Sequence, residues 1–142
     1  MTSPSVFAVA LAGGAVVGVV AHELTHYIVA RMLGIPATIG WLELETYFVA
    51  SDERTEWRDV VAGSAPVLVG TTTFPLTLYA LVGVGGSLGV AMFMAWLFYT
   101  VCLPVPGGAS ATDYRCVAAL LRGRYNAAFD SGEELQGSDL PP

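Results

Sequence analysis

Three long apolar segments dominate the sequence and limit the folds that the chain can adopt. They extend from Val6 to Leu33, from Val60 to Val82 and from Val84 to Leu103. A helix rises by about 1.5 Å per residue, so about 20 residues cross the roughly 30 Å hydrocarbon core of a bilayer. Each of these segments is therefore long enough to span a membrane as a helix.

The composition favours the same interpretation. Of the 142 residues, 54% are hydrophobic and only 13% are charged, whereas soluble domains contain about 25% charged residues. A short chain exposes much of its surface, so a large part of this surface must face something other than water. The net charge of -6 argues against nucleic acid as a partner. We therefore expect an integral membrane protein in contact with lipid.

The remaining segments predict the smaller elements of the fold. Alternating apolar and polar residues within 37–50 predict a short hairpin or edge strand after the first helix. The charged segment Ser51–Asp59 predicts a solvated loop, and Thr112 is placed to cap a short helix from Asp113 to Arg122. The expected fold class is an all-α membrane protein with three transmembrane helices, a short C-terminal helix and this small β-hairpin or strand.

The predicted domain organisation is a single intramembrane core followed by a tail. The core comprises residues 1–125, with spans at about 6–33, 60–82 and 84–103. Residues 126–142 carry several acids and no base, a composition typical of disordered segments.

The arginines predict how the spans are oriented. They lie either between the first two spans or after the third, as Arg31, Arg54, Arg58, Arg115, Arg122 and Arg124. With an odd number of spans all of them fall on one side, and the positive-inside rule makes that side cytoplasmic. We expect a multi-pass protein with its N-terminus outside and its C-terminus in the cytoplasm.

Residues 22–26, His-Glu-Leu-Thr-His, match the pattern HExxH within the first apolar segment. Four residues turn a helix by about 400°, so His22 and His26 face the same way and can bind one zinc ion, with Glu23 beside it to act on water. They are the only 2 histidines in the protein, and ionisable groups inside a membrane helix are costly and usually functional. The pattern predicts a metalloprotease site; a structural polar cluster is the alternative.

A catalytic zinc ion commonly takes three protein ligands and a water. Asp113 is the predicted third ligand, because it follows the third span on the side where the first helix ends. Stabilisation of a helix N-terminus is the ordinary role for such an acid. Other side chains with donor atoms are Cys116, Glu43 and Glu45, for which core packing and the wet face of a strand are the ordinary roles.

In these features the sequence resembles the site-2 protease family of intramembrane zinc metalloproteases. Residues Ala21–His26 and Leu33–Pro36 are similar to the zinc-binding helix of that family and to its exit into a membrane-associated β-hairpin. Ala62–Pro66 is similar to its small-residue Gly-Pro segment, without the downstream Asn. Leu103–Gly108 resembles its proline-rich approach to an Asp-Gly ligand motif, but the acid is absent there and Asp113 follows from a longer loop.

The resemblance covers roughly residues 6 to 122 and implies a minimal three-helix catalytic core. It implies that His22, His26 and Asp113 bind Zn²⁺ and that Glu23 is the general base and acid. The implied function is hydrolysis of peptide bonds in or near transmembrane segments of membrane proteins. A substrate helix must unwind before cleavage, and the strand around residues 42–49 could hold it extended by β-addition.

Two other functions remain open from the sequence. The first is a catalytically inactive relative that serves as a metal-binding membrane scaffold. The second is a zinc carrier, which is disfavoured because no relay of intramembrane acids crosses the other spans. Besides a membrane-protein substrate and lipid, the expected partners are a second copy of the chain or an accessory membrane protein, since glycine-rich helix surfaces associate readily.

Overall fold

The computed structural model describes residues 3–40, 45–48, 56–100 and 111–123. Its helices are α1 (Pro4–Met32), α2 (Glu56–Tyr79), α3 (Gly86–Thr100) and α4 (Ala111–Arg122), and a π-helical turn η1 (Ala80–Val84) extends α2. Strands β1 (Ala37–Gly40) and β2 (Glu45–Phe48) form an antiparallel sheet in which Ala37 pairs with Phe48. The expected mainly helical fold with a small hairpin after the first helix is confirmed in this part of the chain.

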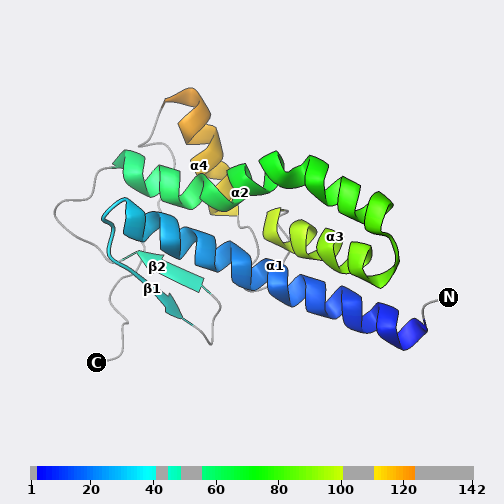
Figure 1. Ribbon diagram of the computed structural model, residues 1–142. Coiled ribbons are helices and arrows are strands. Elements are labelled where there is room, and N and C mark those ends of the chain that lie inside the picture. The colour runs from blue at the N-terminus through cyan, green and yellow to red at the C-terminus, as the bar shows by residue number, and fades with distance from the viewer. Residues whose placement is uncertain (1–2, 41–44, 49–55, 101–110, 124–142) are drawn as a thin grey trace.

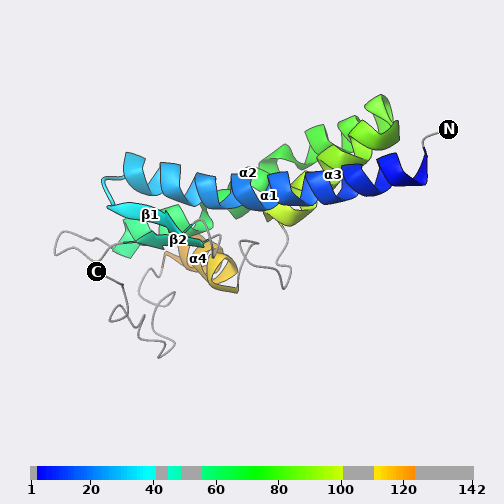
Figure 2. The ribbon, with the colours of Figure 1, turned by 90° about the horizontal axis from the view of Figure 1, so that it is seen from below.

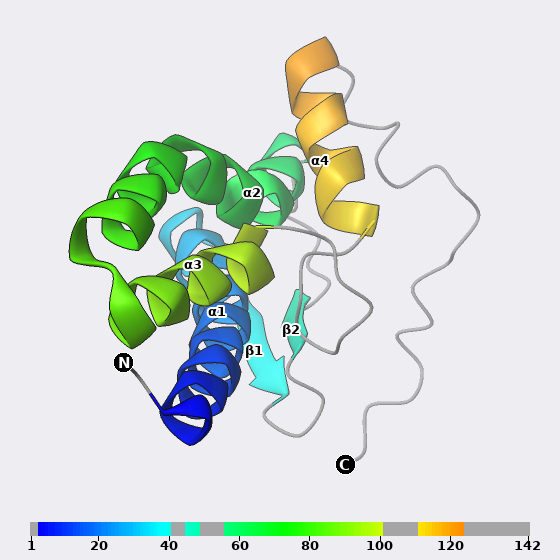
Figure 3. The ribbon, with the colours of Figure 1, turned by 90° about the vertical axis from the view of Figure 1, so that its right-hand side faces the viewer.

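The helices form a bundle in which the described part of α3 is shorter than α1 and α2. Helices α1 and α2 run side by side, and α3 lies along the N-terminal half of α1 (Figure 1). The hairpin and α4 project from the same side of the bundle (Figures 2 and 3). The end of α3 and the start of α4 therefore approach the middle of α1.

Local features of the sequence delimit helix α1. The Ser3 side chain accepts a hydrogen bond from the backbone N–H of Val6 at 3.4 Å, and Pro4 occupies the first turn. At the other end Gly34 adopts φ 77°, a conformation that glycine takes without steric cost. The chain then turns back, and Ile35 packs in a small core with Ala30.

Two glycines on α1 allow close packing against α3. A Cβ atom at Gly14 would overlap the carbonyl oxygen of Ala91, and one at Gly18 would overlap that of Ala95. Small residues at such contacts let helix backbones approach each other. Helices α1 and α3 therefore pack at close range along this face.

The charged segment before α2 differs from its prediction. Residues 51–55 lie outside the described residues, but the last part of the expected solvated loop is helical, because α2 begins at Glu56. Asp59 is only 7% exposed, and Val60 packs against Cys116 and Ala119 of α4. The loop prediction was wrong for residues 56–59, because α4 covers this end of the helix.

Two helices are long and apolar enough to cross a membrane, Pro4–Met32 and Trp57–Val84. In the most apolar 18 residues of each helix, only 17% and 22% of the residues are buried inside the protein. Most of these apolar side chains therefore face outwards, unlike those of a core helix. The expected third span at 84–103 is described as a helix only over Gly86–Thr100, which is 15 residues long. The described part of that helix is about 22 Å long, shorter than a hydrocarbon core.

Several expectations fall outside the described residues. They are the tail at 126–142, the end of the core at residues 124–125 and the proline-rich segment before α4. The C-terminal helix, expected from Asp113, starts two residues earlier at Ala111. Thr112 therefore lies within the helix instead of capping it.

Candidate metal centre

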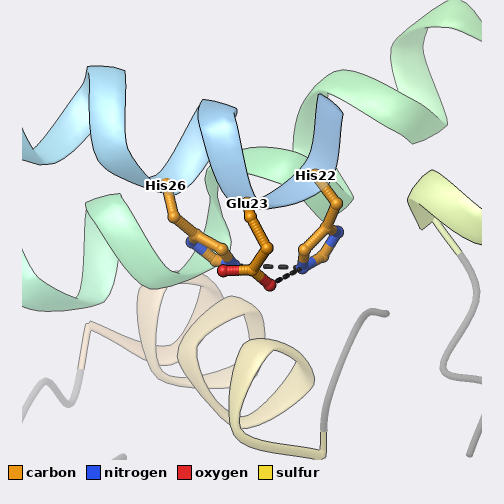
Figure 4. Close-up of side chains that lie close together, drawn as sticks. All are labelled: His22, Glu23 and His26. Carbon is orange, nitrogen blue, oxygen red and sulfur yellow. Dashed lines mark hydrogen bonds and ion pairs between the residues drawn. The ribbon is translucent and has the colours of Figure 1, made fainter. Parts of the chain in front are cut away.

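Three ionisable side chains lie together in the C-terminal half of the mostly apolar helix α1. His22 is 0% exposed, Glu23 8% and His26 6%. All three point away from α1 into the same space, towards α4 (Figure 4). Their ligand atoms all lie within 4.8 Å of one another, so this buried group could hold a metal ion.

Each imidazole is oriented by a backbone carbonyl from another helix. His22 Nδ1 lies 2.7 Å from the carbonyl oxygen of Tyr99 in α3, and His26 Nδ1 lies 2.9 Å from that of Ala62 in α2. A carbonyl oxygen only accepts hydrogen bonds, so Nδ1 is the donor in both rings. In a neutral imidazole the proton on Nδ1 leaves Nε2 with a free lone pair, the state in which it binds a metal.

The two Nε2 atoms face each other across 3.0 Å. Glu23 Oε1 lies 4.0 Å from His22 Nε2. Asp113 from the first turn of α4 is 6% exposed, and its carboxylate oxygens lie 3.4 Å from His22 Nε2 and 3.3 Å from His26 Nε2. The structure thus brings Asp113 to the two histidines, although it is distant in the sequence.

This arrangement concentrates acceptor atoms in a small buried volume. Two imidazole lone pairs and two carboxylates repel each other in a region of low dielectric unless a positive charge lies among them. Either a proton or a metal ion can supply that charge. The chemistry of the donors, nitrogen and carboxylate oxygen, fits zinc.

Cys116 lies one turn beyond Asp113 but packs away from this group. Its side chain is 1% exposed and contacts Gly63 of α2, where an added Cβ would be only 2.7 Å from the sulfur. Burial raises the pKa of the Cys116 thiol to about 12, and the negative charges of Asp113 and Asp59 act in the same direction. The thiol is therefore protonated at neutral pH and serves as a small core residue.

Glu45, a further donor considered from the sequence, does not join the group. Glu45 lies on the exposed face of β2 and accepts a hydrogen bond from the Tyr47 hydroxyl at 3.2 Å. Glu43 lies outside the described residues. The Tyr114 hydroxyl donates to the carbonyl oxygen of Thr100 at 2.6 Å and so ties α4 to the end of α3.

Some contacts around the group have no counterpart in the sequence analysis. The Thr46 hydroxyl donates to the carbonyl oxygen of Glu23 at 2.9 Å, and the ring of Phe48 lies 6.4 Å from that of His26. The Tyr99 hydroxyl is hydrogen-bonded to Thr25 at 3.0 Å. Backbone acceptors have no side-chain signature, and a short strand with alternating residues does not show which distant residues it contacts. The sequence alone therefore contains no signal for these contacts.

No protein-family model matches the chain, and no curated protein or solved structure is significantly similar to it. The fold and the site therefore define the class of protein by themselves. It is a mainly helical protein with two helices able to span a membrane and a buried group, His22, Glu23 and His26, that could hold a metal ion.

Proposed function

We propose that this protein is an intramembrane zinc metalloprotease that hydrolyses peptide bonds in or near transmembrane segments of membrane proteins. In this proposal His22, His26 and Asp113 bind zinc, and Glu23 is the general base and acid. The observation that carries it is the convergence of two imidazole Nε2 atoms 3.0 Å apart, each ring held by a carbonyl at Nδ1. Zinc-binding histidines usually donate a hydrogen bond from the N–H of their other ring nitrogen in this way.

The residues divide the chemistry among them. A bound zinc ion would lower the pKa of a coordinated water and polarise the substrate carbonyl. The Glu23 carboxylate faces the same space, and its Oε1 lies 4.0 Å from His22 Nε2, farther away than the nearest Asp113 oxygen. This position suits a carboxylate that takes a proton from water and returns it to the departing amine. Low exposure of all these side chains keeps bulk water away and strengthens their electrostatic interactions.

The membrane setting belongs to the same proposal. Outward-facing apolar side chains on α1 and α2 support burial in lipid. The proposal keeps the third apolar segment, of which α3 is the described part, as the third span. The distribution of the arginines supports an outside N-terminus and a cytoplasmic C-terminus.

The hairpin is a suitable place to hold an unwound substrate. The sheet has only two strands, so each strand keeps one edge without a strand partner in the described sheet. Strand β2 is tied to the backbone of Glu23 through Thr46. A substrate strand added to the hairpin would therefore run close to the carboxylate that acts on water.

A catalytically inactive metal-binding membrane scaffold is the second candidate. It is supported by the same buried group, His22, Glu23 and His26, and requires no reaction at Glu23. The two functions differ in their response to Glu23. In a protease, Glu23→Gln abolishes hydrolysis and leaves zinc bound. A scaffold shows no hydrolysis in either the wild type or the variant.

The test measures zinc content and peptide cleavage on the same detergent-purified samples. The probe is a quenched fluorescent peptide with helix-breaking residues inside an apolar segment. We expect zinc in wild type and Glu23→Gln, and cleavage in wild type only. Glu133→Gln, outside the described residues, is the matched control for loss of one carboxylate. Zinc without cleavage in wild type would favour the scaffold, and absence of zinc would overturn both metal-based functions.

A further inference from the structure

A proline lies in the interior of α2, where it is fully buried, one helical turn after a residue that is hydrogen-bonded to the metal-binding group. Pro66 stands four residues after Ala62, whose carbonyl oxygen is the acceptor for His26 Nδ1. In a regular helix that carbonyl would accept the N–H of residue 66. Proline has no N–H, and its ring pushes the carbonyl four residues earlier away from the helix axis. The Ala62 carbonyl therefore lacks its ordinary donor four residues later and is available to another helix.

His22 also finds its acceptor on another helix, because its Nδ1 lies 2.7 Å from the backbone carbonyl of Tyr99 in α3. Both imidazoles are thus held by backbone carbonyls of neighbouring helices. At Ala62 the ordinary N–H donor of that carbonyl is missing because residue 66 is a proline.

We propose that Pro66 is a positioning residue for His26. Its missing N–H keeps the Ala62 carbonyl free to accept the proton of His26 Nδ1. That hydrogen bond fixes the tautomer in which the Nε2 lone pair faces His22 and Asp113. The purpose of this orientation rests on the proposed zinc function, but the orientation itself does not require a bound ion.

The second proline of α2 provides a matched control. Pro75 also lies inside the helix, and it removes the donor for the carbonyl of Thr71. Both Pro75 and Thr71 are exposed, whereas Pro66 and Ala62 are buried. Substituting either proline restores one backbone N–H to α2, but only the change at Pro66 introduces a competitor for the His26 hydrogen bond.

The test follows histidine tautomers by ¹⁵N NMR on metal-free protein in detergent micelles, at mildly alkaline pH. With only 2 histidines the spectrum contains two imidazoles, which His22→Ala assigns. In wild type and Pro75→Ala we expect both rings to carry the proton on Nδ1. In Pro66→Ala we expect His26 to shift towards the Nε2–H tautomer, while His22 keeps its state as an internal control.

Zinc affinity gives an independent second readout. Loss of the partner that orients a ligating histidine typically weakens metal binding by about 10- to 100-fold. We expect a decrease in this range for Pro66→Ala and little change for Pro75→Ala, measured by competition with a chromophoric chelator. If wild type binds no zinc, the proposed function fails, and the tautomer measurement still decides the role of Pro66.

The outcomes that overturn the proposal are specific. It is wrong if His26 keeps the Nδ1 proton in folded Pro66→Ala, because the proline would then act only by packing. Pro66→Val, which also restores the N–H with a larger side chain, replaces the alanine variant if that variant does not fold. If neither variant folds, the wild-type spectrum decides: an Nε2–H tautomer of His26 overturns the proposal, and an Nδ1–H tautomer supports it.

Discussion

His22 Nδ1 lies 2.7 Å from the carbonyl oxygen of Tyr99, so the last turn of α3 holds a side chain from the middle of α1. The same turn is contacted from α4, where the Tyr114 hydroxyl donates to the carbonyl oxygen of Thr100 at 2.6 Å. The end of α3 therefore joins the two elements that carry the candidate ligands. A change in the packing of α3 should disturb the metal-binding group as well as the fold.

We expect Asp113→Ala to lower the zinc affinity by more than the roughly 10- to 100-fold that follows loss of an outer hydrogen-bond partner. The reason is that its carboxylate approaches both Nε2 atoms, within 3.4 Å and 3.3 Å. Zinc content measured after dialysis against a weak chelator checks this. Asp139→Asn, in the acidic segment outside the described residues, should leave zinc bound. Equal zinc content in Asp113→Ala and wild type would show that Asp113 is not the third zinc ligand.

Gly18→Val should destabilise the protein, because its Cβ would overlap the carbonyl oxygen of Ala95 on α3. Overpacking of this kind typically costs about 1–3 kcal/mol, and backbone contacts leave little room for relaxation. Gly13→Val is the control: on the same helix its Cβ meets nothing within 4 Å. Thermal unfolding in detergent should separate the two variants. Equal unfolding temperatures would contradict the close contact between α1 and α3.

The Cys116 thiol should react slowly with alkylating reagents at pH values around neutrality. Burial raises its pKa from an ordinary value of 9.0 to about 12, and the thiolate is the reactive form. Mass spectrometry of the labelled peptides distinguishes Cys116 from Cys102. If Cys116 in the folded protein is labelled as fast as after unfolding, the thiol is not buried and the described contact between α2 and α4 is contradicted.

The Cys116 thiol also makes the stability of the protein depend on pH. Between pH 9.0 and about 12 the thiol keeps its proton in the folded protein and loses it in the unfolded chain. The unfolded state then binds fewer protons, so the free energy of unfolding falls as the pH rises through this range. Cys116→Ala should flatten this part of the profile. If the free energy of unfolding falls equally steeply with pH in wild type and variant, other groups cause the pH dependence in this range.

Thr46→Val should loosen the hairpin from α1, because it removes the hydroxyl that donates to the carbonyl of Glu23 at 2.9 Å. A typical hydrogen bond contributes about 1 kcal/mol to stability, and valine keeps the preference for a strand. The matched control is Thr38→Val on β1, where the side chain is exposed. Hydrogen exchange of β2 amides should speed up in the first variant only. Unchanged exchange in both would remove Thr46 as an anchor.

Much of the fold follows from local sequence features. The cap at Ser3, the first-turn Pro4 and the turn at Gly34 delimit α1 because they act on neighbouring backbone groups. The four-residue spacing of His22 and His26 puts both on one face of any helix that contains them. By contrast, the sequence predicted a loop where α2 begins at Glu56, because burial of Asp59 depends on a distant helix.

The sequence by itself determined the apolar helices and the alignment of two imidazoles on one of them, since helical periodicity is a property of neighbouring residues. Only the tertiary structure decided what surrounds those imidazoles. The carbonyls of Ala62 and Tyr99 and the carboxylate of Asp113 reach them from three other helices. Which distant groups meet depends on how whole helix faces pack, and no local pattern encodes that. Packing therefore turned a pair of histidines into a buried group able to hold a metal ion.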